Sequence, residues 1–494
     1  MNRQVRRLAI FLMVLYVGLY VQLNITSVVR ADEYRNDPAN TRGLQRDFSR
    51  PRGLIVTSDG VVVARSVEVD DELERLREYP EGDLYAHTAG FLSLEYGAAG
   101  LEDELNGVLS GESRDVAFRS LSDLIFDRNR TADVTMTLRH AVQEVARESL
   151  GERRGSVVAL DPRTGAVLAM WSYPSYEPAQ LSSHDLAAVT AYRESLFEGD
   201  PECRSCPLLG KAYQAVFAPG STFKVVTGTA GLESGQVTRD SPVYPVVTEY
   251  VPPQTDQPIQ NFGGSACGGD IAQALARSCN TSFAQMAVDV GGQQMSDTSV
   301  AYGFNREIPI DLPDPAVSTF PDAEFFVDNQ PLLAQSGIGQ FEVAATPLQM
   351  AMVAGAVANQ GIAMAPHVVQ EIRDSDGRVV RTSDPHAFSS AMSLATAESM
   401  NDLMVGVVTG GTGGSVAIPG VTVGAKTGTA EITEDSDDTH AWMIAFAPAE
   451  APTVAVAVIV EGALESGTQT GGGVAGPIAR SVLEAALSST APAE

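Results

Sequence analysis

The strongest constraint on the fold of this 494-residue chain comes from apolar, β-rich segments at both ends of its C-terminal part. Residues 156–170 contain two such runs around a turn-like sequence at 161–165, which indicates a hairpin of buried strands. Three further runs lie far downstream, at 421–430, 441–446 and 453–460. A sheet assembled from both ends of a domain, with helices inserted between its strands, is typical of an α+β fold.

The sequence between these strands supports the same arrangement. Residues 180–410 supply the helices and long loops rich in proline and glycine, and no internal repeat is visible. We therefore predict a single domain over 151–490, in which helices are inserted into a sheet.

The region before that domain is predicted to form a separate small module. Residues 31–50 are polar and indicate a linker, whereas 53–64 contains two β-rich runs around a Ser-Asp-Gly turn. Residues 70–125 are mixed and acidic, and the apolar spacing at 138–150 favours an amphipathic helix. These features predict a linker and a small α+β module over 31–150.

Residues 1–30 carry a targeting signal. Three arginines precede an apolar run at 8–21, which continues with a few polar residues to position 29. The whole stretch reaches about 20 residues, which is enough to cross a bilayer. Positive charge before the span places the N-terminus in the cytoplasm and the body outside it. We predict an uncleaved anchor; a cleaved signal peptide is the alternative, since 29–31 loosely resembles a cleavage site.

The charge balance argues against one class of function. The chain carries a formal net charge of −29 at pH 7. A strongly acidic surface repels phosphate backbones, so we expect no nucleic-acid partner. The simplest interpretation of the charge is a solvated surface that keeps the protein soluble.

Four cysteines fit an oxidising compartment outside the cytoplasm. Cys203 and Cys206 are compatible with a structural disulfide, a redox pair or half of a metal site. No second CxxC sequence and no adjacent His pair completes a zinc site, so we expect no metal. Cys267 and Cys279 can form a second pair, with a buried free thiol at Cys279 as the alternative.

Lysine is almost absent from the chain, with three lysines against thirty arginines, and two of the three belong to short motifs. Ser221 and Lys224 are three residues apart where a Pro-Gly sequence favours the start of a helix, so their side chains share a face and can meet. A serine hydroxyl needs a base to become a nucleophile. Arginine stays protonated, whereas a desolvated lysine can be neutral and act as that base. Alone, the same spacing also fits a solvated helix face.

A second motif, Ser278-Cys279-Asn280, lies between the two lysine motifs. Ser278 can relay a proton to a leaving group, while the amide of Asn280 orients the lysine and the substrate. Alone, the pattern also fits a capped helix end or a polar turn. Asn280 also begins a glycosylation sequence, and because a glycan would block the site, this favours a bacterial source.

The third motif, Lys426-Thr427-Gly428-Thr429, lies in a β-rich run. Small residues on an edge strand let a substrate backbone lie beside it, and Lys426 and the threonine hydroxyls offer charge and donors to a terminal carboxylate. The alternative is an edge strand protected by a lysine. The three motifs in this order predict a serine acyl-transfer site.

These motifs, in this order and at these separations, resemble the active-site motifs of the penicillin-binding proteins. The likeness spans nearly the whole chain, because the sequences at 52–60, 161–165 and 440–448 also match the context of that family. The short N-terminal module leaves no room for a glycosyltransferase domain, which indicates class B. Ala425 stands where many relatives have glycine, a departure that should not change the chemistry.

The resemblance implies a penicillin-binding transpeptidase fold: a mainly antiparallel sheet flanked by helices, a helical subdomain, an N-terminal α+β pedestal module and a transmembrane helix. It implies a membrane-anchored D,D-transpeptidase that cross-links peptidoglycan during growth or division, needs no cofactor and is inhibited by β-lactams. A polymerase of the RodA/FtsW type is the membrane partner that the family implies.

The resemblance also implies a role for each motif residue. Ser221 would attack the penultimate D-Ala carbonyl of a stem peptide ending in D-Ala-D-Ala, with Lys224 as base, Ser278 as proton relay and Asn280 as orienting amide. The backbone N–H groups of Ser221 and Thr429 would form the oxyanion hole. The residues expected to bind the substrate are those of the third motif, Lys426, Thr427, Gly428 and Thr429.

Two other functions remain open at this point. A D,D-carboxypeptidase or a β-lactamase-like hydrolase on the same fold needs water to resolve the acyl-enzyme, and no residue can be named as the base for that step. A non-catalytic β-lactam sensor would need a further transmembrane signalling region, and none is visible in the sequence.

Overall fold

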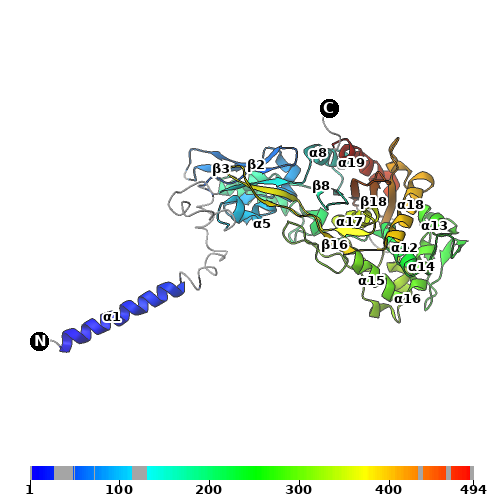
Figure 1. The fold of residues 1–494 in the computed structure, drawn as a ribbon, viewed down its shortest axis with the longest axis horizontal. Helices are drawn as coiled ribbons and strands as arrows, with labels where there is room; N and C mark the ends of the chain where they lie inside the picture. Colours follow the sequence, from blue (N-terminus) through cyan, green and yellow to red (C-terminus); the bar gives the residue numbers. More distant parts are fainter. Residues whose placement is uncertain are drawn as a thin grey trace.

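The computed structural model describes residues 3–26, 30, 48, 50–71, 73–113, 131–431, 438–462 and 469–489. Figure 1 shows an N-terminal helix, a small module and a larger domain of sheet and helices. Most of the predicted linker, the end of the predicted acidic module and two of the three residues at the alternative cleavage site lie outside the described residues.

The predicted sheet of the larger domain is confirmed, and its neighbouring strands are all antiparallel. Its strands are β7 (Gly155–Leu160), β8 (Val167–Tyr173), β17 (Gly424–Glu431), β18 (Thr439–Ala447) and β19 (Val454–Val460). The order β17-β18-β19-β7-β8 joins the two ends of the domain, because Val458 of β19 lies opposite Val157 of β7. Every residue of β7 and β19 is buried, as expected for central strands that are covered on both faces.

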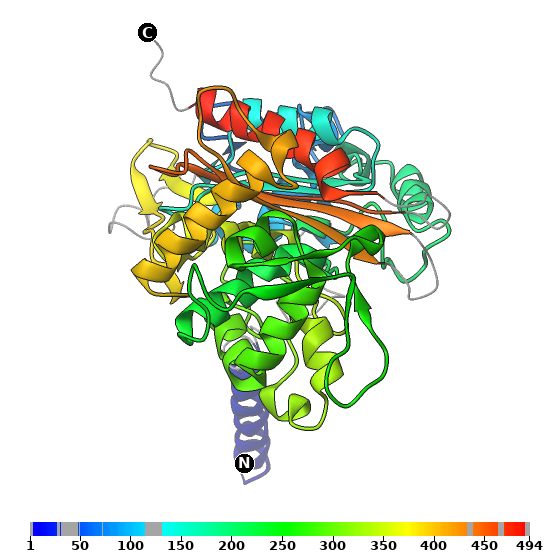
Figure 2. The same cartoon turned by 90° about the vertical axis from the view of Figure 1, so that its right-hand side faces the viewer.

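Helices cover both faces of this sheet (Figure 2). On one face α8 (His140–Leu150) packs beside α19 (Gly476–Ser488), and on the other lies α17 (Pro347–Ala358). The helix predicted at 138–150 is therefore confirmed, with a start two residues later. All residues of α17 are buried, so this helix forms the centre of the core between the sheet and the remaining helices.

A helical subdomain lies beyond α17 (Figure 2). Its helices are α12 (Lys224–Glu233), α13 (Ile271–Ala276), α14 (Asn280–Val290), α15 (Gly292–Tyr302), α16 (Gln330–Ser336) and α18 (Leu394–Gly410). Side-chain caps fix where two of them begin: Asp270 accepts a hydrogen bond from the backbone N–H of Gln273 at the start of α13, and Ser393 caps α18 in the same way.

The N-terminal module contains a second sheet, with strand order β15-β14-β6-β1-β2-β3. These strands are β1 (Ile55–Val56), β2 (Val62–Glu68), β3 (Arg75–Glu78), β6 (Ala132–Met136), β14 (Val369–Asp374) and β15 (Val379–Thr382). The hairpin predicted at 53–64 is confirmed, because β1 and β2 pair antiparallel. Two strands of this sheet, β14 and β15, come from within the range predicted for the larger domain, a contribution that the sequence did not indicate.

Shorter elements connect these layers. In the N-terminal module they are η2 (Gly82–Tyr85), α4 (Ala86–Ala89), β4 (Leu92–Ser93), β5 (Gly97–Ala98), α5 (Leu101–Glu104) and α6 (Asn106–Leu109). In the larger domain they include α9 (Pro178–Leu181), α10 (Leu186–Leu196), α11 (Lys211–Gln214), η4 (Gly220–Phe223), β9 (Tyr244–Val247), β10 (Glu249–Tyr250), β11 (Ile259–Gln260), β12 (Cys267–Gly269), β13 (Ile362–Met364), β16 (Ala387–Ser390) and η7 (Gly414–Val416).

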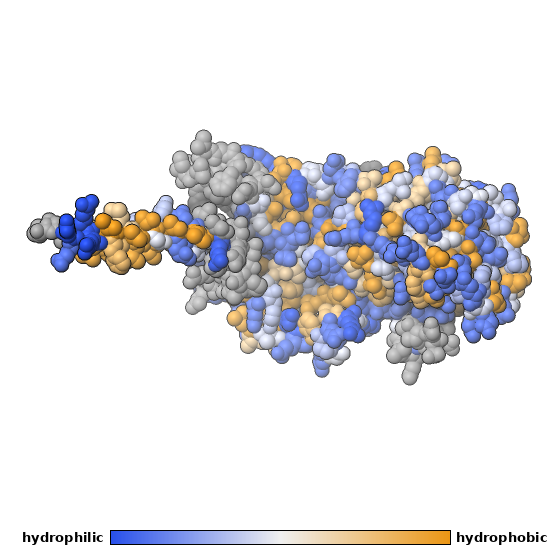
Figure 3. Space-filling view, turned by 90° about the horizontal axis from the view of Figure 1, so that it is seen from below, coloured by the Kyte–Doolittle hydropathy of each residue, from blue (hydrophilic) through white to orange (hydrophobic). Residues whose placement is uncertain are grey.

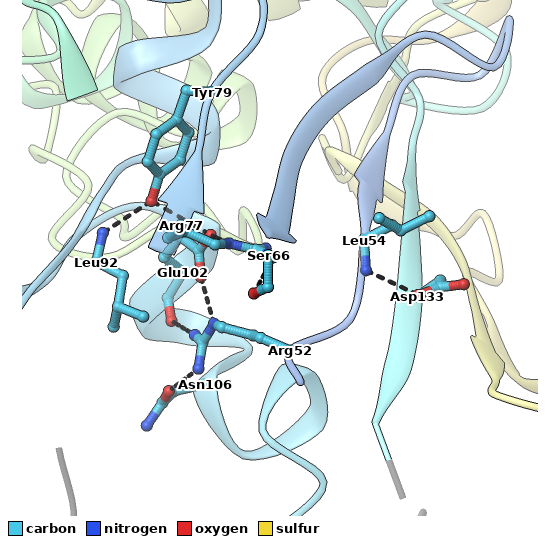
Figure 4. A network of polar contacts seen from close by, with 9 residues as sticks. All are labelled: Arg52, Leu54, Ser66, Arg77, Tyr79, Leu92, Glu102, Asn106 and Asp133. Carbon is cyan, nitrogen blue, oxygen red and sulfur yellow. Dashed lines mark hydrogen bonds and ion pairs between the residues drawn. The ribbon is translucent and has the colours of Figure 1, made fainter. Parts of the chain in front are cut away.

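A buried ionic network joins the segment just before β1 to the rest of the N-terminal module (Figure 4). Glu102 is fully buried and accepts a hydrogen bond at 2.6 Å from the Nε of Arg52 and another at 2.6 Å from the Nε of Arg77. Arg52 also donates to Asn106 at 2.6 Å. Buried charges are tolerated when they are paired in this way, so the network determines how the segment before β1 packs on α5 and α6.

The N-terminal helix α1 (Arg3–Asn24) is long and apolar enough to cross a membrane. The stretch Arg6–Asn24 has a mean hydropathy of 1.6, and none of it is buried against the rest of the described chain. Figure 3 shows apolar side chains along this helix and hydrophilic ones at its N-terminal end. A helix of this kind fits a membrane anchor.

Both cysteine pairs form disulfide bonds, one between Cys203 and Cys206 and the other between Cys267 and Cys279. The alternative of a free thiol at Cys279 is therefore wrong. The second bond ties β12 to the residue in the middle of the Ser278-Cys279-Asn280 motif, so it holds this motif against the strand.

Candidate active site

The Ser221 turn is held by close backbone contacts on two sides. Ser221 lies in the 3-10 turn η4, which continues directly into α12 as the Pro-Gly sequence predicted. Gly220 has a φ of +52° and donates its N–H to the Gly339 carbonyl at 2.9 Å. A Cβ at Gly220 would lie 2.6 Å from the Thr429 carbonyl oxygen, so only glycine lets this turn approach the third motif.

Strand β17 lies against the same turn through Gly428. A Cβ at Gly428 would lie 2.8 Å from the Trp442 Cβ, 2.9 Å from the Thr222 Cγ2 and 3.0 Å from the Pro219 carbonyl oxygen. Trp442 also donates its indole N–H to the Ala218 carbonyl at 3.0 Å, which fixes the loop before Ser221. The glycine of the third motif is therefore required for close packing between the motif and the nucleophile turn.

The Lys224 amine is completely buried and points to the second motif. It donates to the Ser278 carbonyl at 2.8 Å and to the Asn280 Oδ1 at 2.7 Å, and it lies 3.4 Å from the Ser278 hydroxyl. The expected hydrogen bond from Ser221 to Lys224 is not formed, and within the described residues the Ser221 hydroxyl has no partner. The first and second motifs are thus joined through the lysine, and the partly exposed Ser221 hydroxyl is free for a substrate.

The second motif is at the junction of α13 and α14. Ser278 has a φ of +59°, a conformation that non-glycine residues rarely adopt and that occurs preferentially at functional sites. Asn280 is the first residue of α14, and its amide donates to the Gln260 carbonyl at 2.9 Å. Cys279 is the N-cap residue and makes no side-chain cap, so the capped-helix interpretation of this motif does not apply.

The Lys426 amine is also completely buried, and it points inward from β17. It donates to the Ser278 hydroxyl at 2.8 Å and to the Thr427 carbonyl at 2.8 Å. The Ser278 hydroxyl therefore lies between two amines, those of Lys224 and Lys426. Hydrogen bonds connect five of the eight predicted residues, Lys224, Ser278, Asn280, Lys426 and Thr427, whereas Ser221, Gly428 and Thr429 lie together at the turn beside them.

Burial changes the protonation of both lysines. The pKa of Lys224 is held well below its usual value of 10.5, first by desolvation and then by the charge of Lys426. Desolvation lowers the pKa of Lys426 to about 7. The lowered pKa favours the neutral amine at Lys224, which is the form that can accept a proton from Ser221.

These shifts predict the pH dependence of acylation. We expect the second-order rate of penicillin acylation to fall on the acid side as Lys224 gains its proton. Replacing Lys426 with glutamine removes the neighbouring charge, so the pKa of Lys224 should rise and the acid limb should move to higher pH. Acylation rates measured by intact mass between about pH 5 and pH 10 test this. An acid limb that stays in place or moves to lower pH would contradict it.

One residue that contacts the cluster lies outside the sequence motifs. Thr412 lies in a glycine-rich loop after α18 and shares a hydrogen bond of 2.6 Å with the Thr427 hydroxyl. Lys211, the third lysine, is buried and forms an ion pair with Glu461, so its role is that of a charged structural partner. The glycines around Thr412 indicate a tight turn in the sequence, but nothing in the sequence indicates which motif that turn contacts.

The fold and the residue cluster together define a serine acyl-transfer domain. Matches to two sequence families confirm this class. The model of the penicillin binding protein transpeptidase domain matches residues 155–484, and that of the penicillin binding protein A dimerisation domain matches 52–134. The chain belongs to the penicillin-binding protein transpeptidases.

Relatives and solved structures agree with this family. The chain is 40% identical to the peptidoglycan D,D-transpeptidase PbpA of Mycolicibacterium smegmatis, over 91% of this chain and 92% of the relative. It is 37% identical to the PbpA of Mycobacterium tuberculosis, with the same coverage of both chains. It is also similar to the structure of M. tuberculosis penicillin-binding protein A in its penicillin G acyl-enzyme complex, with a TM-score of 0.80, 35% identity, and coverage of 89% of this chain and 100% of that chain.

Proposed function

We propose that this transpeptidase cross-links peptidoglycan, with Ser221 as the nucleophile that forms an acyl-enzyme with D-Ala-D-Ala stem peptides. The observation that carries the proposal is the buried Lys224 amine, which the second motif holds three residues from Ser221. The names of the relatives support the reaction, and an acyl-enzyme of penicillin-binding protein A with penicillin G supports the same chemistry with β-lactams.

The acylation step follows from the placement of Ser221 and Lys224 three residues apart, where η4 continues into α12. The Ser221 oxygen forms a bond to the carbonyl carbon of the penultimate D-Ala, and its proton passes to the neutral Lys224 amine. Backbone N–H groups of Ser221 and of Thr429 stabilise the oxyanion. This placement is consistent with the close approach of the two segments, where a Cβ at Gly220 would lie 2.6 Å from the Thr429 carbonyl oxygen.

The proton reaches the leaving group through the second motif. The Ser278 hydroxyl lies 3.4 Å from the Lys224 amine and 2.8 Å from the Lys426 amine. It can therefore take up the proton from Lys224 while it gives its own proton to the leaving amine. The C–N bond breaks, and the amine of the terminal D-Ala leaves with that proton. An amine from a neighbouring stem peptide then forms a bond to the acyl carbon, the ester C–O bond to Ser221 breaks, and a proton from that amine returns to the Ser221 oxygen.

The third motif binds the terminal carboxylate of the donor peptide. β17 is an edge strand of the sheet, so a substrate backbone can lie along it, while Gly428 lets this strand approach the Ser221 turn closely. Thr427 and Thr429 donate hydroxyl hydrogen bonds to the carboxylate, and Lys426 adds positive charge in its protonated form.

The proposal extends to the location of the enzyme. The helix α1 crosses the membrane once, the N-terminus lies in the cytoplasm and the catalytic domain lies outside. Two disulfides are consistent with an oxidising compartment. A RodA/FtsW-type polymerase is the proposed membrane partner, and co-purification of the two full-length proteins from mixed membranes tests this part.

The reaction is tested with a stem pentapeptide as donor and a second stem peptide with a free side-chain amine as acceptor. We expect free D-Ala and a cross-linked dimer, both detected by mass spectrometry. Release of D-Ala without a dimer, at every acceptor concentration, would indicate a carboxypeptidase instead. Stable penicillin acylation with no turnover of stem peptides would indicate a sensor. Peptide mapping of the penicillin adduct should place it on Ser221.

A further inference from the structure

Thr412 connects the second and third motifs although it belongs to neither. Its hydroxyl lies 2.6 Å from the Thr427 hydroxyl, and its backbone N–H donates to the Ala276 carbonyl at 3.0 Å. Ala276 is the last residue of α13, two positions before Ser278. A Cβ at Gly411 would lie 2.2 Å from the same carbonyl oxygen, so the loop lies directly on the end of α13. Thr412 is therefore anchored to the helix end just before the second motif, while its side chain contacts the third motif.

The position of Lys426 leaves threonine hydroxyls as the donors to a substrate carboxylate. Its amine is committed to Ser278 and to the Thr427 carbonyl, and burial lowers its pKa to about 7. A large share of the Lys426 amine is therefore neutral near pH 7. Its hydrogens point into the protein, away from the side of β17 on which a substrate would lie. Recognition of a substrate carboxylate on that side then depends on hydroxyl donors, of which Thr427 is the one in the middle of the motif.

A threonine hydroxyl has one hydrogen to donate and two lone pairs that accept. The separation of 2.6 Å between Thr412 and Thr427 means that one of the two hydrogens lies between these oxygens. If Thr427 donates to Thr412, it has no hydrogen left for a ligand. If Thr412 donates to Thr427, the Thr427 hydrogen is available for a carboxylate, and the donated bond polarises it further.

We propose that Thr412 is a positioning residue that donates its hydroxyl hydrogen to Thr427 and thereby directs the Thr427 hydroxyl to the carboxylate of stem peptides and β-lactams. This inference rests on the proposed function, because it assumes that the carboxylate binds at the third motif. Thr412 is exposed at the rim of the cluster, whereas Thr427 is 7% exposed, which fits a pair in which the outer residue orients the inner one.

The experiment compares penicillin G with its methyl ester, which lacks the negative carboxylate. Thr412→Val keeps the shape of the side chain but removes the hydroxyl, and we expect it to lower the acylation rate by penicillin G about tenfold. The rate for the ester should stay within about twofold of the original enzyme, because the ester makes no charged hydrogen bond at Thr427. Both rates are measured as adduct formation by intact mass.

Two further variants separate positioning from packing. Thr412→Ser restores the hydroxyl and should recover most of the rate for penicillin G. Thr409→Val is the matched control, because among the described residues the Thr409 hydroxyl bonds to the Val405 carbonyl of its own helix and to no residue of the motifs. In a Thr427→Val background, Thr412→Val should have no further effect on the rate, since its target is gone.

Several outcomes would overturn the proposal. An equal loss with penicillin G and with the ester would indicate a structural role, as would a Thr412→Ser variant as slow as Thr412→Val. An unchanged rate for Thr412→Val would show that Thr427 needs no such donor. Failure of the proposed function itself has a different signature, because acylation by either compound would then persist in Ser221→Ala.

Discussion

Replacing Lys224 with arginine is expected to lower the rate of penicillin acylation by about 10²- to 10⁴-fold, the usual contribution of a general base. The structure places this amine at 0% exposure with its hydrogens directed to Ser278 and Asn280. Its pKa lies well below the usual value because burial and then the charge of Lys426 disfavour the protonated form. Arginine stays protonated under the same conditions, so it cannot accept the Ser221 proton.

Two further variants, at Ser221 and at Lys211, serve as controls for Lys224→Arg. Ser221→Ala fixes the background, because no adduct should form without the hydroxyl. Lys211→Arg is the matched control: Lys211 is buried too, but its partner is the carboxylate of Glu461, which accepts either cation. Intact mass after timed exposure to penicillin gives all three rates. A Lys224→Arg enzyme that acylates at the original rate would remove Lys224 from the role of base.

The second large effect is expected in the N-terminal module. Glu102→Gln leaves the charges of Arg52 and Arg77 without their shared counter-ion, in a site where all three side chains are at most 5% exposed. Breaking a buried ion pair by removing one partner costs about 3–5 kcal/mol, because the charge left behind is neither solvated nor paired. Urea unfolding of the soluble part, followed by fluorescence, measures this loss in the free energy of unfolding.

An exposed ion pair of the same sheet gives the control for that measurement. Arg65 and Glu78 lie 3.0 Å apart with side chains that are 51% and 38% exposed, so Glu78→Gln should change stability by less than about 1 kcal/mol. Similar losses for Glu102→Gln and Glu78→Gln would contradict the assignment of the buried network as the main ionic contribution of the module.

The same network predicts how the stability of the module depends on pH. Burial alone would raise the pKa of Glu102, but the charges of Arg77 and Arg52 outweigh it, so the pKa lies below the usual value of 4.5. Since the folded state then binds fewer protons than the unfolded state, this stability is present above pH 4.5 and is lost as the pH falls through the folded pKa. In Glu102→Gln this acid-dependent loss should be absent.

The order and spacing of short segments in the sequence determined most of the architecture. The apolar run that begins at 156 and the run at 453–460 are continuous rather than alternating, a pattern that requires cover on both faces, and they became the adjacent central strands β7 and β19. The scarcity of lysine singled out Lys224 and Lys426, since a neutral amine cannot be supplied by arginine.

Only the tertiary structure decided which groups these amines contact. Local spacing suggested that Lys224 meets Ser221, but packing directed it to Ser278, 54 residues away, and turned Lys426 to the same hydroxyl, 148 residues away. Spacing along a helix or strand fixes the face on which a side chain lies, whereas contacts between distant segments depend on how those faces pack. For the same reason the disulfide at Cys279, the two added strands of the N-terminal sheet and the contact of Thr412 with Thr427 emerged only from the folded chain.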